Sequence, residues 1–133
     1  MPLKLLKGKS VLVIEDDVFV RSVLSVALIE EGYEVIEART GKEALETLRE
    51  QIPYAVMLDP ALPDIDGFEI SRMIRDEEEM AGVRVVVVAG REGMLNKLCG
   101  FLAGVRSLRE EQSLVASIEE QVDIYAKQWE FAN

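Results

Sequence analysis

The chain has 133 residues, of which 49% are hydrophobic, and a formal net charge of −10. Its length and apolar content predict one domain with a substantial core, and its acidity argues against a nucleic-acid partner, which would require clustered lysine and arginine. Histidine is absent, so a histidine base or metal ligand is excluded, and the single cysteine, Cys99, excludes an internal disulfide and is expected to be a small buried hydrophobe.

No apolar run approaches the length of a membrane span, and the N-terminal segment lacks the apolar region of a signal peptide. We therefore expect a cytoplasmic protein without membrane contact.

The first half of the chain alternates between strand-like and helix-like segments. Residues 10–15, SVLVIE, are short, β-branched and continuously apolar, which is typical of a strand covered on both faces. Residues 17–32 carry an apolar stripe at helical spacing and end in Gly32, which suits the turn after a helix. Residues 33–38 predict a second strand, and residues 40–50 a second helix that opens with a capping-box pattern.

The second half continues the alternation. Residues 54–59, YAVMLD, predict a third strand, and residues 67–79 a third helix. Four consecutive valines in residues 83–90 predict a fourth strand in the centre of the sheet. A weaker helix over 91–104, a short fifth strand over 105–108 (VRSL) and a last helix over 111–130 complete the series.

This alternation predicts an α/β fold, a doubly wound parallel sheet of five strands with helices on both faces. Right-handed crossovers and the chain length favour the flavodoxin-like strand order 2-1-3-4-5. In such sheets, ligands bind beyond the carboxyl ends of the strands, at the switch point between strands 1 and 3.

Acidic residues follow the two strands that meet at this switch point. Glu15, Asp16 and Asp17 end the first strand, and Asp59 ends the third. Taken singly, Asp17 is also a good helix cap and Asp59 an ordinary turn residue. Their convergence favours a site, because crowded carboxylates repel one another unless a cation such as Mg²⁺ neutralises them. Such a site suits phosphoryl transfer.

Three stretches carry a resemblance to a known family: VLVIEDD, GYEVIEARTGKEAL and LDPALPDIDGFE. They resemble the receiver (CheY-like) domain of bacterial two-component response regulators. The resemblance covers roughly residues 9–122, which leaves residues 1–8 as an N-terminal extension and 123–133 as a C-terminal helix extension.

The resemblance implies that Asp59 is a phosphoacceptor in phosphorelay signal transduction, served by a sensor histidine kinase or a phosphotransfer protein. It implies Mg²⁺ as cofactor, with Glu15 and Asp16 as the acidic pair and the backbone carbonyl of Ala61 completing the protein ligands. The chain would be a signalling domain and not an enzyme, beyond self-catalysed phosphoryl transfer.

The sequence departs from the family pattern after the third strand. Ala89 stands where receivers usually have Ser or Thr. The position of the family's lysine falls near Glu110 or Glu111, and the aromatic position near Ser107 or Leu108. The alternative is therefore a pseudo-receiver, a protein-interaction module independent of phosphorylation. A hydrolase of the haloacid dehalogenase type is disfavoured, because Ala61 occupies the place of its second acid.

Apolar residues continue beyond the resemblance, at Tyr125, Trp129 and Phe131. Because exposed aromatic residues commonly mark contacts between proteins, we expect a homodimer or another partner at the C-terminal helix.

Overall fold

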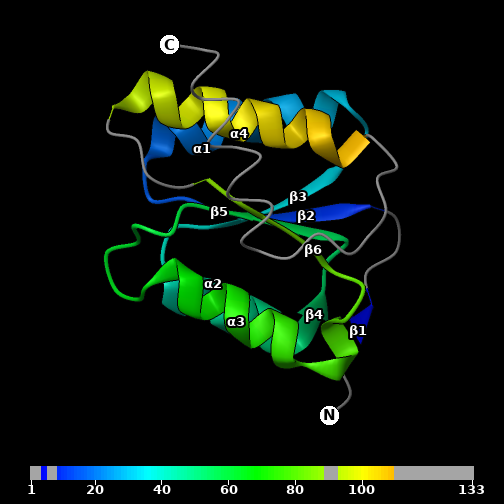
Figure 1. Ribbon diagram of the computed structural model, residues 1–133. Helices are drawn as coiled ribbons and strands as arrows, with labels where there is room; N and C mark the ends of the chain where they lie inside the picture. The colour runs from blue at the N-terminus through cyan, green and yellow to red at the C-terminus, as the bar shows by residue number, and fades with distance from the viewer. Residues whose placement is uncertain (1–3, 6–8, 89–92, 110–133) are drawn as a thin grey trace.

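The computed structural model describes residues 4–5, 9–88 and 93–109, and the arrangement of its elements is shown in Figure 1. Several sequence predictions lie outside these residues: the roles of Ala89 and Glu110, the last helix over 111–130, and the contacts expected of Trp129 and its aromatic neighbours.

Among the described residues, four parallel strands form the central sheet in the order β3-β2-β5-β6. Their bounds are Ser10–Ile14 for β2, Glu34–Ala38 for β3, Ala55–Leu58 for β5 and Arg84–Val87 for β6. This is the order predicted for the first four strands. A second sheet, which the sequence did not indicate, pairs β1 (Lys4–Leu5) with β4 (Gln51–Ile52).

The prediction that the valine-rich strand lies in the sheet centre is wrong for the part of the chain described. Strand β6 pairs with β5 and is one of the two outer strands of the four. Its valines are nevertheless buried, because Val86 and Val88 pack into the core on one face of the sheet, and Val85 and Val87 into the core on the other. The continuous apolar run therefore reflects coverage of both faces and not a central position.

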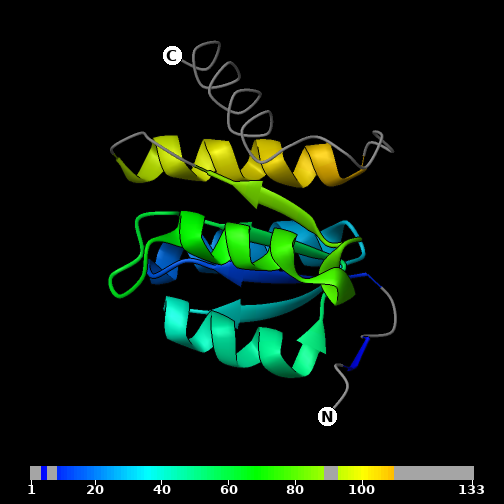
Figure 2. The ribbon, with the colours of Figure 1, turned by 60° about the horizontal axis from the view of Figure 1, so that its bottom comes forward.

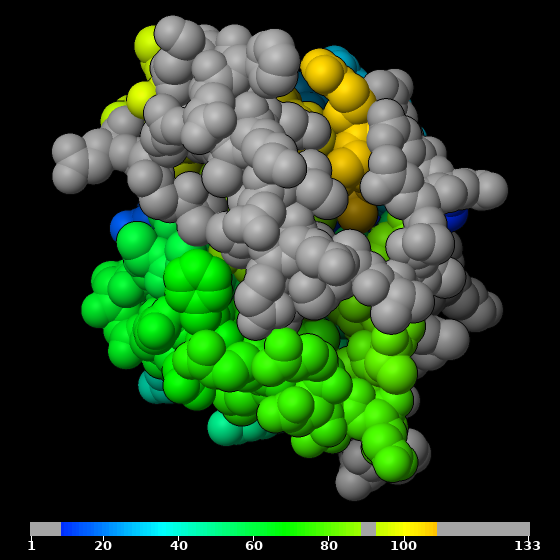
Figure 3. Space-filling view, viewed as in Figure 1, coloured from blue at the N-terminus to red at the C-terminus, as the bar shows by residue number. Residues whose placement is uncertain are grey.

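Two helices cover each face of the sheet (Figures 1 and 2). Helices α1 (Val18–Glu30) and α4 (Met94–Arg109) contact each other on one face. Helices α2 (Gly41–Glu50) and α3 (Gly67–Asp76) lie on the other, and α3 is followed by a short 3-10 helix, η1 (Glu78–Met80). Helix α3 and the turn after it lie at the surface in Figure 3. Within the described ranges, no helix has both the length and the apolar content that a membrane crossing requires.

Local hydrogen bonds explain where the first three of these helices begin. The side chains of Asp17, Thr40 and Asp66 accept backbone N–H groups of α1, α2 and α3 respectively. These bonds satisfy donors that have no partner within the helix. Gly32 has a φ of 92° directly after the C-cap residue of α1, so it takes the left-handed position that glycine adopts without steric cost.

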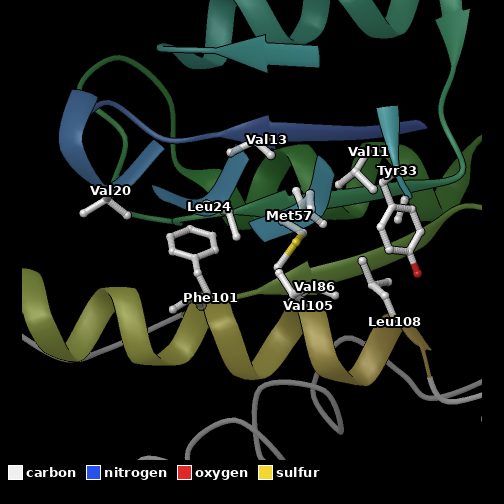
Figure 4. Packing of buried hydrophobic residues seen from close by; sticks show 13 residues of the cluster. Val11, Val13, Val20, Leu24, Tyr33, Met57, Val86, Phe101, Val105 and Leu108 are labelled. Carbon is white, nitrogen blue, oxygen red and sulfur yellow. The ribbon is translucent and has the colours of Figure 1, made fainter. Parts of the chain in front are cut away.

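The predicted fifth strand over residues 105–108 is wrong, because α4 runs without interruption to Arg109. Phe101, Val105 and Leu108 recur at helical spacing, and all three are buried in the core cluster that α4 shares with α1 and the sheet (Figure 4). Arg106 between them is exposed, as the helical period requires.

Cys99 also differs from its prediction, because it is exposed and not buried. It lies on the outward side of α4, four residues after the exposed Leu95 and two before the inward-facing Phe101. The apolar neighbourhood in the sequence thus mixes residues of two opposite helix faces.

Candidate functional site

The carboxyl edge of the sheet places two acidic side chains next to each other. Ile14 at the end of β2 pairs in register with Leu58 at the end of β5, and the backbone N–H of Asp59 donates to the carbonyl of Ile14 at 3.2 Å. Glu15 and Asp59 therefore leave adjacent strands at the same level. Carboxylate oxygens of Glu15, Asp16 and Asp59 all lie within 4.8 Å of one another. The structure thus brings together three of the four acids that were predicted to lie at the switch point.

The three carboxylates differ in their surroundings. Glu15 is fully buried and Asp59 nearly so, while the side chain of Asp16 is 46% exposed. Oδ1 of Asp59 accepts the N–H of Ala61 at 2.9 Å, and Oε1 of Glu15 accepts the N–H of Asp17 at 3.0 Å. The side chain of Asp17 caps α1, and in the described part of the chain the group of acids that could hold a metal does not include it.

Lys97 of helix α4 places its ammonium among these carboxylates. Its Nζ atom lies 2.7 Å from Oε1 of Glu15, 2.7 Å from Oδ2 of Asp59 and 3.8 Å from Oδ1 of Asp16. The sequence analysis missed this residue. A signal was present, since Lys97 is the only charged residue among residues 94–105 and lies one turn before the buried Phe101.

Burial and the ammonium of Lys97 shift the pKa of Glu15 in opposite directions. Burial raises the pKa of Glu15 to about 7, although the hydrogen bond from Lys97 lowers it. For Lys97, burial alone would lower the pKa, but the bonds to Asp59 and Glu15 outweigh burial and raise it above its ordinary value. Oε2 of Glu15 is buried, and no atom of the described residues makes a hydrogen bond to it. The site therefore retains a carboxylate oxygen without a hydrogen-bond donor among the described residues.

Arg21 stabilises the loop between β2 and α1 through its backbone carbonyls. Its Nη1 donates to the carbonyl of Glu15 at 2.8 Å and to that of Asp16 at 3.4 Å, and its Nε lies 3.4 Å from a carboxylate oxygen of Glu37. The guanidinium is buried and binds backbone oxygens, so it positions the acidic loop without neutralising its carboxylates.

The loop after Asp59 is held against the start of α3. The N–H of Gly67 donates to the carbonyl of Pro60 at 2.9 Å, and Ala61 forms a bridge with Asp66. Ala61 is exposed beside the acids, and the role of its carbonyl as a metal ligand stays a prediction. Asp64 lies apart from the cluster, where its carboxylate accepts the first two N–H groups of α2.

The donor set fits a hard divalent cation. Glu15, Asp16 and Asp59 offer only oxygen ligands, and the orphaned Oε2 of Glu15 could bind an ion or a water molecule of its shell. The half-exposed Asp16 opens the cluster to solvent, which suits an ion that keeps several of its waters.

Comparison with known proteins decides the family. Residues 11–108 match the family described as response regulator receiver domain. The chain belongs to that family. It is therefore a receiver domain of two-component signalling, and its flavodoxin-like α/β fold agrees with the prediction from sequence.

Several relatives illustrate the similarity. The transcriptional regulatory protein AfsQ1 of Streptomyces coelicolor is 36% identical over 71% of this chain and 41% of its own length. The polar-differentiation response regulator DivK of Brucella ovis is 34% identical over 60% of this chain and 65% of its own length. The chain thus spans less than two thirds of either relative.

Solved structures share the fold. A putative response regulator from Chloroflexus aurantiacus matches with a TM-score of 0.60 and 31% identity, over 74% of this chain and 80% of that one. The chemotaxis response regulator CheY4 of Vibrio cholerae matches with a TM-score of 0.60 over 65% of this chain and 72% of that one, and its 24% identity supports the fold alone.

Proposed function

We propose that this receiver domain accepts a phosphoryl group on Asp59 with the help of Mg²⁺. One observation carries the proposal: the Asp59 carboxylate lies at the carboxyl end of β5, within 4.8 Å of carboxylate oxygens of Glu15 and Asp16. Membership of the receiver family supports the same reading.

The two oxygens of Asp59 have different surroundings, which suggests which one reacts. Oδ1 accepts the N–H of Ala61, so that bond holds the carboxylate in place. Oδ2 instead contacts the ammonium of Lys97 at 2.7 Å. In the transfer, Oδ2 attacks the phosphorus of a phosphohistidine, the P–N bond breaks, and the histidine nitrogen leaves with the bonding electrons and takes up a proton.

Glu15, Asp16 and Asp59 would hold the ion, together with the carbonyl of Ala61. When bound, Mg²⁺ would neutralise the charge that gathers on the phosphoryl oxygens during transfer. Glu15 must lose its proton to act as a ligand, because only the ionised carboxylate binds a cation well. Burial raises the pKa of Glu15 to about 7, so this requirement is greatest at Glu15.

The partner of this reaction would be a sensor histidine kinase or a phosphotransfer protein, in the cytoplasm. The domain would act as a signalling acceptor and not as an enzyme with turnover. A homodimer through the C-terminal helix remains a further prediction, which falls on residues outside those described.

The test is incubation with acetyl phosphate or phosphoramidate, with and without Mg²⁺, followed by intact-protein mass spectrometry. Wild type should gain one phosphoryl group only with Mg²⁺, and Asp59→Asn should gain none. Asp64→Asn is the matched control, because Asp64 is an exposed acid that caps α2, and it should behave like wild type. Absence of phosphate on wild type would reject the proposal and favour the phosphorylation-independent interaction module.

A further inference from the structure

The ammonium of Lys97 occupies the space that the three carboxylates share. It makes two bonds of 2.7 Å, one to Glu15 and one to Asp59, and lies 3.8 Å from Asp16. A magnesium ion bound directly to any of these oxygens would stand about 2.0–2.1 Å from them. Two cations held by the same oxygens would lie only a few ångströms apart in a largely buried place, where their repulsion is weakly screened.

Helix α4 fixes the base of this lysine but leaves its end free to move. Phe101 and Val105, one and two turns further along, are buried against α1 and the sheet, so the helix backbone is held by its core contacts. The side chain of Lys97 is 23% exposed and reaches the acids with a flexible four-carbon stem. The ammonium can therefore leave the carboxylates by side-chain rotation, without a shift of the helix.

We propose that Lys97 is a tethered counter-ion that competes with the divalent cation for Glu15 and Asp59. In the metal-free protein, its ammonium offsets part of the negative charge of the cluster. Metal loading then requires displacement of the ammonium from both carboxylates, which weakens the affinity of the site for the ion. This inference rests on the proposed metal site, but not on phosphoryl transfer itself.

The decisive experiment compares Mg²⁺ binding by wild type, Lys97→Met and Arg106→Met by isothermal titration calorimetry. Arg106 is an exposed cation on the same helix, so its replacement removes the same charge away from the acids. Lys97→Met should bind Mg²⁺ at least about tenfold more tightly than wild type, since the free energy of one modest ionic contact is enough to change the affinity tenfold. Arg106→Met should bind like wild type. Lys97→Arg, which keeps a cation, should stay close to wild type.

Thermal unfolding adds a second readout, the rise in melting temperature on addition of Mg²⁺. A purely structural ion pair would not change this rise. Without metal, Lys97→Met should melt below wild type, because three carboxylates then lack their counter-ion. With saturating Mg²⁺ its melting temperature should rise by more than that of wild type, because the stabilisation by a ligand grows with its affinity. If Lys97 only stabilises the fold, Lys97→Met should melt lower than wild type in metal-free buffer, but Mg²⁺ should raise the two melting temperatures equally.

Wild type provides a test that does not depend on the folding of any variant. In an NMR titration with Mg²⁺, the ε-methylene and ammonium signals of Lys97 should move toward those of an exposed lysine. Unchanged Lys97 signals at saturating Mg²⁺, or equal or weaker Mg²⁺ binding by Lys97→Met, would overturn the inference. If either of these results is found but wild type still takes up phosphate with Mg²⁺, the proposed function holds and only the inference about Lys97 fails. If neither wild type nor Lys97→Met binds Mg²⁺, both the inference and the metal part of the proposed function fail.

Discussion

Replacement of Gly67 by alanine should destabilise the domain and disturb the loop that carries Asp59. A Cβ built on Gly67 would stand 2.5 Å from Cδ1 of Leu58, 2.5 Å from Cα of Pro60 and 3.0 Å from the carbonyl oxygen of Asp59. The Leu58 methyl group can rotate away, but the Pro60 contact is with backbone. Relief of that contact requires either the start of α3 or the Asp59–Pro60 loop to move.

The size of the effect follows from two opposing terms. Overpacking of a tight site costs about 1–3 kcal/mol, and a backbone obstacle places Gly67→Ala in the upper part of that range. Alanine restricts the unfolded chain more than glycine does, which returns about 0.4–1 kcal/mol. The net loss should be roughly 2 kcal/mol, which lowers the melting temperature by about 8 °C at about 4 °C per kcal/mol.

Urea denaturation followed by circular dichroism measures this loss, and Gly82→Ala provides the control. Gly82 lies in a turn where an added Cβ would meet no atom within 4 Å, so its replacement should leave stability unchanged or slightly higher. The displaced loop should also slow the phosphorylation of Asp59 in the Gly67→Ala protein. Equal urea midpoints for Gly67→Ala and wild type would show that the close approach of α3 to the Asp59 loop is absent in solution.

Three further outcomes are expected. Phe101→Ala should lose about 3–5 kcal/mol in urea denaturation, because the ring is fully buried between α4, α1 and the sheet, and a loss below 1 kcal/mol would contradict that packing. Asp64 accepts the N–H groups of Lys42 and Gly41, which lower its pKa, so it stabilises the fold above its unfolded pKa of about 3.9 and loses this contribution as pH falls through the lower folded value. Asp64→Ala should therefore lose less stability than wild type between pH 7 and pH 3, and parallel losses in both proteins would refute the cap. Asp16→Asn should weaken Mg²⁺ binding in calorimetry by tenfold or more, roughly the loss of one charged ligand, and an unchanged isotherm would remove Asp16 from the site.

The sequence predicted most of the described fold because its signals there are local. Strands β2 and β5 are short apolar runs between turn residues, and each cap residue precedes its helix directly, so their bounds were recovered to within a residue or two. The segment 105–108 failed because its four residues fit a strand as well as a helix. Only the longer spacing of Phe101, Val105 and Leu108 decides, and this spacing becomes visible once the preceding helix is allowed to continue.

The acids of the site were predictable for a different reason. Parallel strands end at one edge, so a topological rule places Glu15 beside Asp59 without knowledge of any side chain. Lys97 escapes that rule, because it reaches the acids from a helix that follows an outer strand. Whether its side chain points to the sheet edge depends on the rotation of α4 about its axis, which the burial of Phe101 and Val105 sets.

The carboxylates at this edge of the sheet require a compensating positive charge, and this charge can come from any part of the chain that reaches them. Two buried acids and one half-exposed acid within 4.8 Å repel one another whichever element delivers the compensating charge. From the sequence, Mg²⁺ was the expected compensating charge, and the position of the family's lysine fell near Glu110 or Glu111, both of which are acids. The structure supplies a positive charge from the first turn of α4, where Lys97 binds Glu15 and Asp59 together. Because Lys97 binds Glu15 and Asp59 this closely, it opposes the binding of a metal ion, and its positive charge would also attract the phosphoryl group during transfer. Lys97→Met therefore separates these effects: tighter Mg²⁺ binding together with slower phosphate uptake would mean that one ammonium serves both.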